Sequence, residues 1–357
     1  MERNLPKNIF SGYWKTPHCQ GIAVDTKKQY VYYSFTTMLV KTDMQGNVIG
    51  TVKGLMGHLG CIDFNEADGK VYGSLEYKND SIGRGILNML GKGDVQMPDA
   101  FYIAIFDVDK IDRMDMDACT DGVMKTAYLK TVVDDFNAVV SHAGREVKHR
   151  LGCSGIDGTA IGPMPGDLGG KEYLFVAYGV YFDDTRTDND HQVILCYDID
   201  ELNRHCAPLS QNAMHQTGPM EEKKLFVYTG NTEWGVQNLE YDAFTGNYFM
   251  AVYRGHKESF PNYPFFVVDG KKAPEVKKLS GVDGAMEGEM LTLLEAGEKD
   301  ERTGVCGFQF PYGATGMCAL GDGYYYFSHD GGCDDGCYTN VKLYKWDGKN
   351  PFMLVEE

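Results

Sequence analysis

A phrase that recurs five times constrains the fold of this chain more than any other feature. Each copy has a Gly-containing turn and then a short strand of small and apolar residues that ends near Asp or Asn. The copies are HCQGIAVD (18–25), HLGCIDFN (58–65), RLGCSGIDG (150–158), GVQNLEYD (235–242) and GATGMCALG (313–321). Recurrence of one short unit along a chain is typical of a repeat architecture.

Three further strands follow each phrase in the same order. The second strands come after a turn signal and are aromatic: YVYYSF (30–35), KVYGSLEY (70–77), EYLFVAYG (172–179), NYFMAVYRG (247–255) and YYYFSHDG (324–331). The third strands are MLVKTD (38–43), FYIAIFDVD (101–109), QVILCYDID (192–200), PFFVVDG (264–270) and NVKLYKWDG (340–348). The fourth are VIGTVKG (48–54), TAYLKTVV (126–133), KLFVYTG (224–230), EMLTLLEAG (289–297) and PFMLVEE (351–357). Runs of this length bounded by turns predict β-hairpins.

Four-stranded units repeated around a ring define a β-propeller. We therefore expect an all-β chain that forms a single domain over 1–357, a β-propeller of about five four-stranded blades. The approximate blades are 18–53, 58–133, 150–229, 235–295 and 313–356. A large β-sandwich or two small β domains are disfavoured, because the strand order never varies and no Pro-, Gly- or Ser-rich linker separates two halves. The segment NIFSGYW (8–14) is expected to help close the ring, with a sixth blade as the alternative.

The net charge and composition disfavour several classes of partner, and the cysteines indicate the cellular compartment. The net charge of −17 disfavours nucleic acid and anionic membrane surfaces as partners. No apolar run is long enough to cross a bilayer, and residues 1–14 lack the pattern of a signal peptide. The ten scattered cysteines are typical of reduced thiols in a cytoplasm. We expect a cytoplasmic protein, with secretion after removal of a leader as the alternative; the oligomeric state is left open.

The candidate site lies at the mouth of the propeller. The start of each first strand and the end of each second strand lie on one face, because adjacent strands are antiparallel. The loops that open there are long, at 77–100, 179–191, 254–263 and 330–339, and long loops on a rigid scaffold commonly carry binding groups. Polar candidates recur at these points. The predicted catalytic residues are His18, His58, Glu76, Glu233 and His329, and the predicted substrate-binding residues are Gln20, Arg150, Tyr178, Trp234, Gln237, Arg254 and Tyr312.

Three kinds of chemistry are open to this set. The imidazoles of His18, His58 and His149 with the amide of Gln237 would hold a divalent metal such as Mn²⁺, Ca²⁺ or Zn²⁺, although each histidine alone more often bonds loop backbone. Two carboxylates in different environments would serve as acid and base. Arginines would grip a carboxylate or phosphate, and aromatic side chains would stack on sugars or simply pack the blades.

Several other segments carry weaker signals. Residues 82–90 have helical spacing of apolar residues and predict a turn or two of helix across the mouth. The acidic segment 183–190 lacks complete calcium-loop spacing and is expected to be a solvated loop. Cys333 and Cys337 would pair or bind metal, but a structural zinc is disfavoured because no second cysteine pair has zinc-site spacing. The glycine-rich stretches match no phosphate-binding loop, so no nucleotide cofactor is expected.

The repeated strand pattern resembles β-propellers in general, over essentially the whole chain. Five-bladed glycoside hydrolases and histidine-lined, metal-dependent propeller lyases are similar in architecture. The resemblance implies a carbohydrate-active enzyme, a hydrolase or a lyase, with a small molecule or oligosaccharide as ligand. The three-carboxylate signature of the five-bladed hydrolases is not evident at the starts of the first strands, which carry His and Gln more often than Asp. The histidine set is spread over fewer blades than in the lyases. The alternative is a non-catalytic propeller that binds a glycan or a protein, since one fold hosts many functions.

Overall fold

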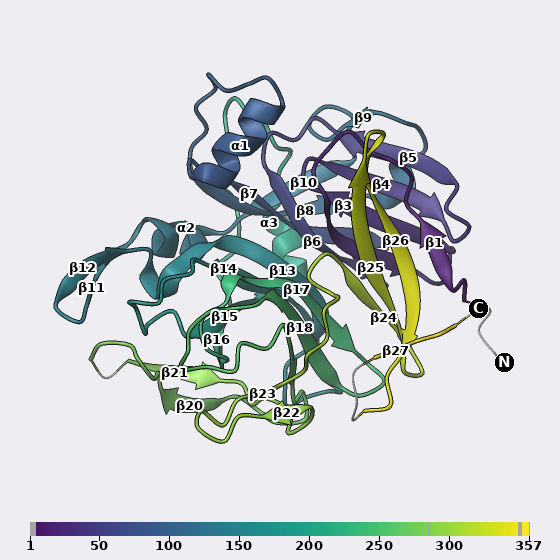
Figure 1. The fold of residues 1–357 in the computed structure, drawn as a ribbon. Coiled ribbons are helices and arrows are strands. Elements are labelled where there is room, and N and C mark those ends of the chain that lie inside the picture. Colours follow the sequence, from purple (N-terminus) through teal and green to yellow (C-terminus); the bar gives the residue numbers. More distant parts are fainter. Residues whose placement is uncertain (1–4, 285, 349–351, 357) are drawn as a thin grey trace.

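The computed structural model describes residues 5–284, 286–348 and 352–356, and it confirms an all-β fold of five blades around one axis (Figure 1). The innermost strands are β2 (Cys19–Asp25), β6 (His58–Asn65), β13 (Cys153–Pro163), β17 (Glu233–Asp242) and β24 (Met317–Gly321). Strand β2 contacts β6, β6 contacts β13, β13 contacts β17, β17 contacts β24, and β24 contacts β2. This closed order of neighbours makes the arrangement a ring.

Each blade extends outward from its innermost strand by antiparallel pairing. Blade 1 continues with β3 (Tyr30–Phe35), β4 (Met38–Asp43), β5 (Val48–Lys53) and the parallel β9 (Met116–Asp117). Blade 2 continues with β7 (Lys70–Tyr77), β8 (Ala100–Phe106) and β10 (Met124–Tyr128). Blade 3 continues with β14 (Glu172–Val180), β15 (His191–Asp198), β16 (Lys223–Tyr228), the parallel β21 (Glu287–Met290) and β20 (Glu275–Lys278). Blade 4 continues with β18 (Asn247–Tyr253) and β19 (Phe265–Val268). Blade 5 continues with β25 (Tyr324–Cys333) and β26 (Gly336–Lys345).

Blade 5 is completed from both ends of the chain, which closes the ring. Strand β1 (Asn8–Phe10) pairs antiparallel with β26 at residues 340–342, and β27 (Met353–Leu354) pairs with β26 at residues 344–345. The first and last strands therefore follow one another along the outer strand of the last blade (Figure 1). Pro351 and Glu357, the ends of the last expected strand, lie outside the described residues.

The core consists of five apolar clusters, one between each pair of neighbouring blades. Between blades 1 and 2, for example, Tyr32 and Leu39 pack with Leu59 and Leu75. Equivalent clusters fill the other four interfaces. Because each blade is covered on both faces, its strands are buried almost continuously, as in β2, rather than on alternate residues. This packing fixes the blades relative to one another and holds the mouth in shape.

Short elements decorate the propeller. The helices are α1 (Ser81–Met89), α2 (Lys130–Asn137) and α3 (Ile199–His205), with 3₁₀ turns η1 (Val108–Lys110) and η2 (Arg150–Gly152). Two small hairpins are formed by β11 (Val139–His142) with β12 (Arg145–Lys148) and by β22 (Glu298–Lys299) with β23 (Cys306–Gly307). Among the described residues, no helix is long and apolar enough to cross a membrane.

Two of the expected fourth strands differ in the structure. The segment 126–133 leaves the sheet after Tyr128 and becomes helix α2, because Val132 and Phe136, one turn apart, are buried against blade 3. The segment 289–297 is shared between two blades. Strand β21 pairs with β16 of blade 3, and Leu294 then donates its backbone N–H to Val267 of blade 4.

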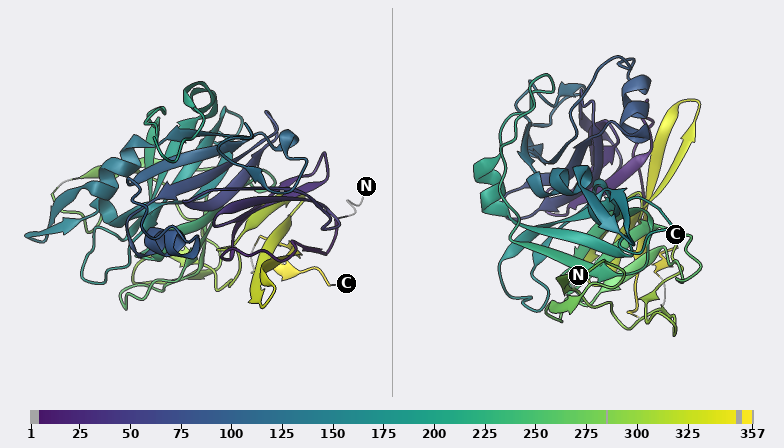
Figure 2. Two further views of the ribbon diagram at one scale, coloured as in Figure 1. Left: turned by 90° about the horizontal axis from the view of Figure 1, so that it is seen from above. Right: turned by 90° about the vertical axis from the view of Figure 1, so that its left-hand side faces the viewer.

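The segment 330–339, expected to be a loop, is also different in the structure and forms the end of a hairpin. Strands β25 and β26 continue their pairing to the turn at Asp334–Asp335 and form a long two-stranded ribbon. This ribbon projects beyond the blades (Figure 2).

Candidate functional site

A cavity of about 340 Å³ opens at the mouth of the ring, between helix α1 and blades 1 to 4. We call it the mouth pocket. Of the residues predicted from the sequence, it brings together His18, Gln20, His58, Glu76, Trp234 and Gln237. Its other polar lining residues are Thr36, Lys78, Ser81, Ser154, Asp157 and Tyr253. A cavity of this size with a few convergent polar groups has the dimensions of a small-molecule site.

Glu76 and Lys78 form a buried ion pair on one wall of the mouth pocket. The two side chains lie on the same side of the strand because residues two apart in an extended segment point to the same face. Lys78 Nζ lies 2.6 Å from Glu76 Oε1 and donates to the carbonyl of Ser154 at 2.9 Å. Both side chains are 5% exposed. Burial raises the pKa of Glu76, and the charge of Lys78 opposes that rise.

Asp157 is the second carboxyl of the pocket, and among the described residues it forms no ion pair. Within the described part of the chain, its Oδ1 is buried without a hydrogen-bond partner and no salt bridge engages it. Burial first, and the charge of Glu76 second, raise the pKa of Asp157 well above its ordinary value. These effects favour the protonated form of Asp157, while Lys78 favours the ionised form of Glu76. Two carboxyls whose environments push their pKa values apart supply one acid and one base.

The histidines at the mouth are neutral. His58 Nδ1 lies 3.7 Å from Glu76 Oε1, and burial together with the charge of Lys78 lowers the pKa of His58 to about 3. Burial also lowers the pKa of His18, whose Nε2 is hydrogen-bonded to the amide of Gln20 at 3.1 Å. A neutral imidazole has one donor and one acceptor nitrogen, and in His18 the acceptor is already used by the Gln20 amide.

Two glycines make room for the carboxyls. A Cβ at Gly155, which has φ +125°, would lie 2.1 Å from Glu76 Oε2. A Cβ at Gly60 would lie 2.2 Å from Asp157 Oδ1. Either contact is far inside van der Waals distance, so the sequence must have glycine at these two positions for the acid pair to fit.

Helix α1 forms an apolar wall opposite the polar strand ends. Asp80 caps its N-terminus by accepting from the backbone N–H of Gly83 at 2.9 Å, and Tyr181 donates its hydroxyl to the same carboxylate at 2.8 Å. Ile86 is buried, while Ile82 and Met89 are more exposed, and all three line the mouth pocket. The helix expected at 82–90 therefore lies across the mouth.

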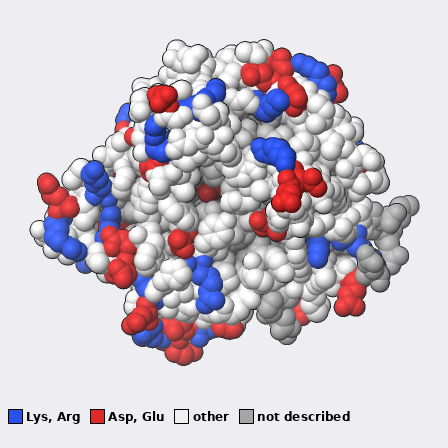
Figure 3. Space-filling model, turned by 45° about the horizontal axis from the view of Figure 1, so that its top comes forward, with Lys and Arg blue, Asp and Glu red and all other residues white. Residues whose placement is uncertain are grey.

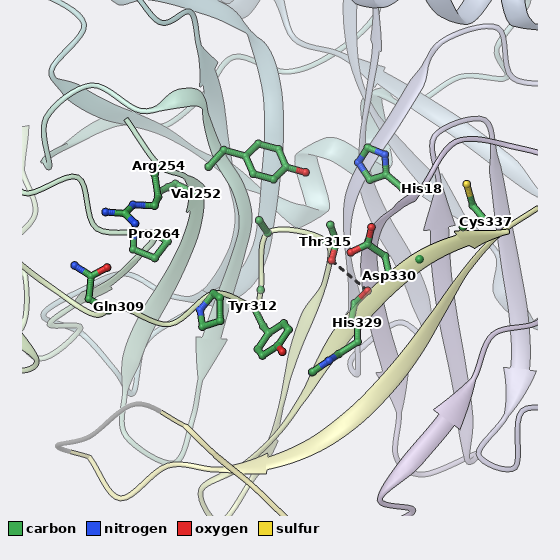
Figure 4. Close-up of a pocket in the computed structure, with 17 residues that line it drawn as sticks. His18, Val252, Arg254, Pro264, Gln309, Tyr312, Thr315, His329, Asp330 and Cys337 are labelled. Atoms are coloured by element: carbon green, nitrogen blue, oxygen red, sulfur yellow. Dashed lines mark hydrogen bonds between the residues drawn. The ribbon is translucent and has the colours of Figure 1, made fainter. Parts of the chain in front are cut away.

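Three other predicted residues lie beside the mouth pocket rather than in it. Arg254, Tyr312 and His329 line a wider cavity of about 1000 Å³, which we call the side groove (Figure 4). Glu233 lines neither cavity: its side chain is 46% exposed and lies 3.4 Å from His256.

Three further predicted residues lie away from both cavities. Arg150 forms an ion pair with Asp135 at 2.9 Å. Tyr178 is completely buried, and its hydroxyl donates to the same carboxylate at 2.9 Å, so it packs the blade interface. His149 bonds the carbonyl of Phe136 through Nδ1 at 2.6 Å and packs against the rings of Phe136 and Tyr181.

These positions do not fit the expected metal site. His149 is outside the mouth pocket, and Gln237 donates its amide to the carbonyl of Trp234 at 3.0 Å. Among the residues that the structure describes, no group of three or more His, Cys, Asp or Glu side chains is placed to hold a metal ion. We therefore assign no chemical step to a metal.

Two further expectations are corrected by burial and by register. In the segment 183–190, Asp188 and Asp190 are buried rather than solvated, because Arg186 and Lys257 form ion pairs with them.

Cys333 and Cys337 are free thiols. The direct cross-strand partner of Cys337 is Gly332, so the Cys333 side chain points to the opposite face of the ribbon and the two sulfurs do not meet.

The sequence interpretation missed Lys78 and Asp157. The sequence predicts that blade 3 opens at residue 150, but β13 begins only at Cys153, after a 3₁₀ turn with positive φ at Leu151. Two register shifts follow within β13 and bring Ser154 and Asp157 to the mouth. Asp157 stands near the end of the opening phrase of blade 3, RLGCSGIDG, where an Asp or Asn recurs in the repeat, so the sequence did offer a signal for it. Lys78 gave none, since most lysines are solvated.

Charged side chains on the face shown in Figure 3 lie in small groups of both signs, and neither sign forms a continuous patch there.

No protein-family model matches the chain, and no curated protein sequence matches it. Among solved structures, a luciferin-regenerating enzyme is similar at 12% identity and a TM-score of 0.37, covering 96% of this chain and 95% of the other. A GH43 β-1,3-galactosidase with galactodeoxynojirimycin is similar at 11% identity and a TM-score of 0.42, covering 98% of each chain. Likenesses at these values carry no conclusion about function.

Proposed function

We propose that this protein is a carbohydrate-active enzyme, a glycoside hydrolase or a lyase, that acts on a substrate held in the mouth pocket. The observation that supports the proposal is the pair of buried carboxyls in unlike environments: Glu76 is ion-paired with Lys78, and among the described residues Asp157 forms no ion pair. Cleavage of a glycosidic bond needs a protonated acid for the leaving oxygen and an ionised partner. Trp234 and Tyr253 offer aromatic surface for a sugar ring in the same cavity.

In this scheme Asp157 donates its proton to the oxygen of the bond that breaks. Glu76 accepts a proton from the attacking water in a hydrolase, or from a ring carbon of the substrate in a lyase. Lys78 keeps Glu76 ionised, and the neutral His58 and His18 bind hydroxyl groups. The apolar wall of helix α1 limits the access of water to the reacting bond.

A screen of neutral and acidic glycosides and polysaccharides tests the proposal. Released reducing ends report hydrolysis, and the ultraviolet absorbance of an unsaturated product reports a lyase. We expect Asp157→Asn and Glu76→Gln to lower kcat by about 10²- to 10⁴-fold, the usual contribution of a positioned acid or base. Asp109→Asn, at an exposed ion pair with Lys28 in the turn after β8, is the matched control and should keep full activity. Carbohydrate binding without turnover by the wild-type protein would favour the alternative, a non-catalytic binding propeller.

A further inference from the structure

The side groove adjoins the mouth pocket. The two cavities share His18 and Tyr253 as lining residues, so the second cavity begins where the first ends. The groove is the larger, at about 1000 Å³ against about 340 Å³, and it runs along blades 4 and 5. Residues from β18, from the segment before β24 and from the projecting ribbon form its walls (Figure 4). A ligand that fills only the mouth pocket leaves this adjoining cavity empty.

An ordered aromatic surface lies in the groove. The rings of Tyr312 and His329 stack with centroids 3.8 Å apart and an angle of 24° between planes. His329 Nε2 is hydrogen-bonded to the Tyr344 hydroxyl at 2.9 Å, which fixes the stack. Tyr312 is 36% exposed. Because burial lowers the pKa of His329 to about 4, the stack is uncharged at neutral pH and suits the apolar face of a sugar ring.

Polar groups flank that surface. Arg254 donates its Nε to the carbonyl of Asn262 at 3.0 Å, and in the described part of the chain no hydrogen bond or ion pair engages its two terminal nitrogens. The side chain of Gln309 is exposed on the same wall (Figure 4). Planar donors beside an aromatic face match the hydroxyl groups at the edge of a stacked sugar.

We propose that the substrate is an oligosaccharide of at least two residues. One residue occupies the mouth pocket beside Glu76 and Asp157, the chain passes between His18 and Tyr253, and the next residue stacks on Tyr312. The inference rests on the proposed function for the chemistry in the pocket, but binding of the chain in the groove is tested separately from turnover.

Binding of a defined series of oligosaccharides measures the groove directly. The probes are an array of neutral and acidic oligosaccharides of one to six residues, followed by calorimetric titration of the best-bound series. We expect the wild-type Kd to fall about tenfold or more from one residue to three. Tyr312→Ala should remove most of that gain and leave the Kd of the monosaccharide unchanged, whereas Tyr312→Phe keeps the ring and should keep the gain. Phe244→Ala, a substitution of an exposed ring in the turn between β17 and β18 at the opposite end of blade 4, is the matched control.

The outcomes separate the two proposals. A Kd that does not depend on length, an equal loss for mono- and trisaccharide in Tyr312→Ala, or no binding of any oligosaccharide would overturn the groove as a subsite. Length-dependent binding through Tyr312 without turnover would support the groove and remove the enzymatic proposal. Turnover of simple glycosides with no effect of oligosaccharide length on binding would support the enzymatic proposal and overturn the groove as a subsite.

Discussion

The buried ion pair between Lys78 and Glu76 gives a prediction whose magnitude follows from the structure. Lys78→Met removes the cation, 2.6 Å from the carboxylate, and leaves Glu76 at 5% exposure with no opposite charge at that distance. The carboxyl then takes up a proton on folding. With an ordinary pKa of about 4.3, protonation at pH 7 costs about 3.7 kcal/mol, at 1.36 kcal/mol for each pKa unit. This agrees with the roughly 3–5 kcal/mol that loss of one partner from a buried pair costs.

The same reasoning gives a dependence on pH. In the variant, the pKa of Glu76 in the folded state lies further above its unfolded value, so the folded state is favoured at low pH and that advantage is lost as the pH rises. The difference in free energy of unfolding between wild type and Lys78→Met should therefore be about 1 kcal/mol at pH 5 and grow toward 3–4 kcal/mol at pH 7.

Urea denaturation at pH 5, 6 and 7, followed by intrinsic fluorescence, measures these differences. Lys53→Met is the matched control, because Lys53 forms an ion pair with Asp115 at 2.9 Å while both side chains are more than half exposed. Exposed pairs contribute about 0–1 kcal/mol, so this variant should lose less than that at every pH. A loss below 1 kcal/mol for Lys78→Met at pH 7, or a loss that does not change with pH, would refute the reasoning.

Three further predictions concern closure, thiols and pH. Ile9→Ala in β1 should lower the free energy of unfolding by about 2–5 kcal/mol, because Ile9 is buried in the closing strand; calorimetry that finds an unchanged Tm would count against closure by β1. Cys333 should react first with a thiol reagent in the native protein, since it is the most exposed of the ten cysteines, and Cys333→Ser should abolish the fast phase; a fast phase that survives would contradict the placement of that thiol. His58→Gln should flatten the decline in stability between pH 6.5 and pH 3, because the unfolded chain protonates His58 in that window and the folded chain does not; an unchanged decline in acid titrations would exclude a buried neutral imidazole.

Much of the ring could be predicted from the sequence because its signals are local. Each opening phrase became an innermost strand, and the aromatic second strands lie next to them, since turn residues and strand composition are read within a few positions. Ring closure by the segment 8–14 was also expected, and β1 confirms it. The sharing of 289–297 by two blades was not visible, because that segment has apolar residues for either edge and tertiary packing decides between them.

Only part of the site was predicted, because the sequence does not show where the pairing between strands shifts in register. In blades 1 and 2 the innermost strand begins at the phrase itself and has one register shift. His18 and His58 at these entrances, and Glu76 at the end of the second strand of blade 2, line the mouth pocket as their positions in the repeat predict. In blade 3 a turn with positive φ and two register shifts displace the strand, and side chains several residues further on reach the pocket instead. A pattern of residue types does not reveal such shifts, which is why His149 was misplaced.

The protonation state of Asp157 at neutral pH tests the account most directly. Infrared spectra of wild type and Asp157→Asn at pH 7 isolate the carboxyl of Asp157 in their difference, even though other buried carboxyls absorb nearby. The structure predicts the C=O stretch of a protonated carboxylic acid that is present in the wild type and missing in the variant. A difference spectrum that shows only an ionised carboxylate would mean that Asp157 carries charge at pH 7, and Asp157 could then not be the proton donor of the proposed pair.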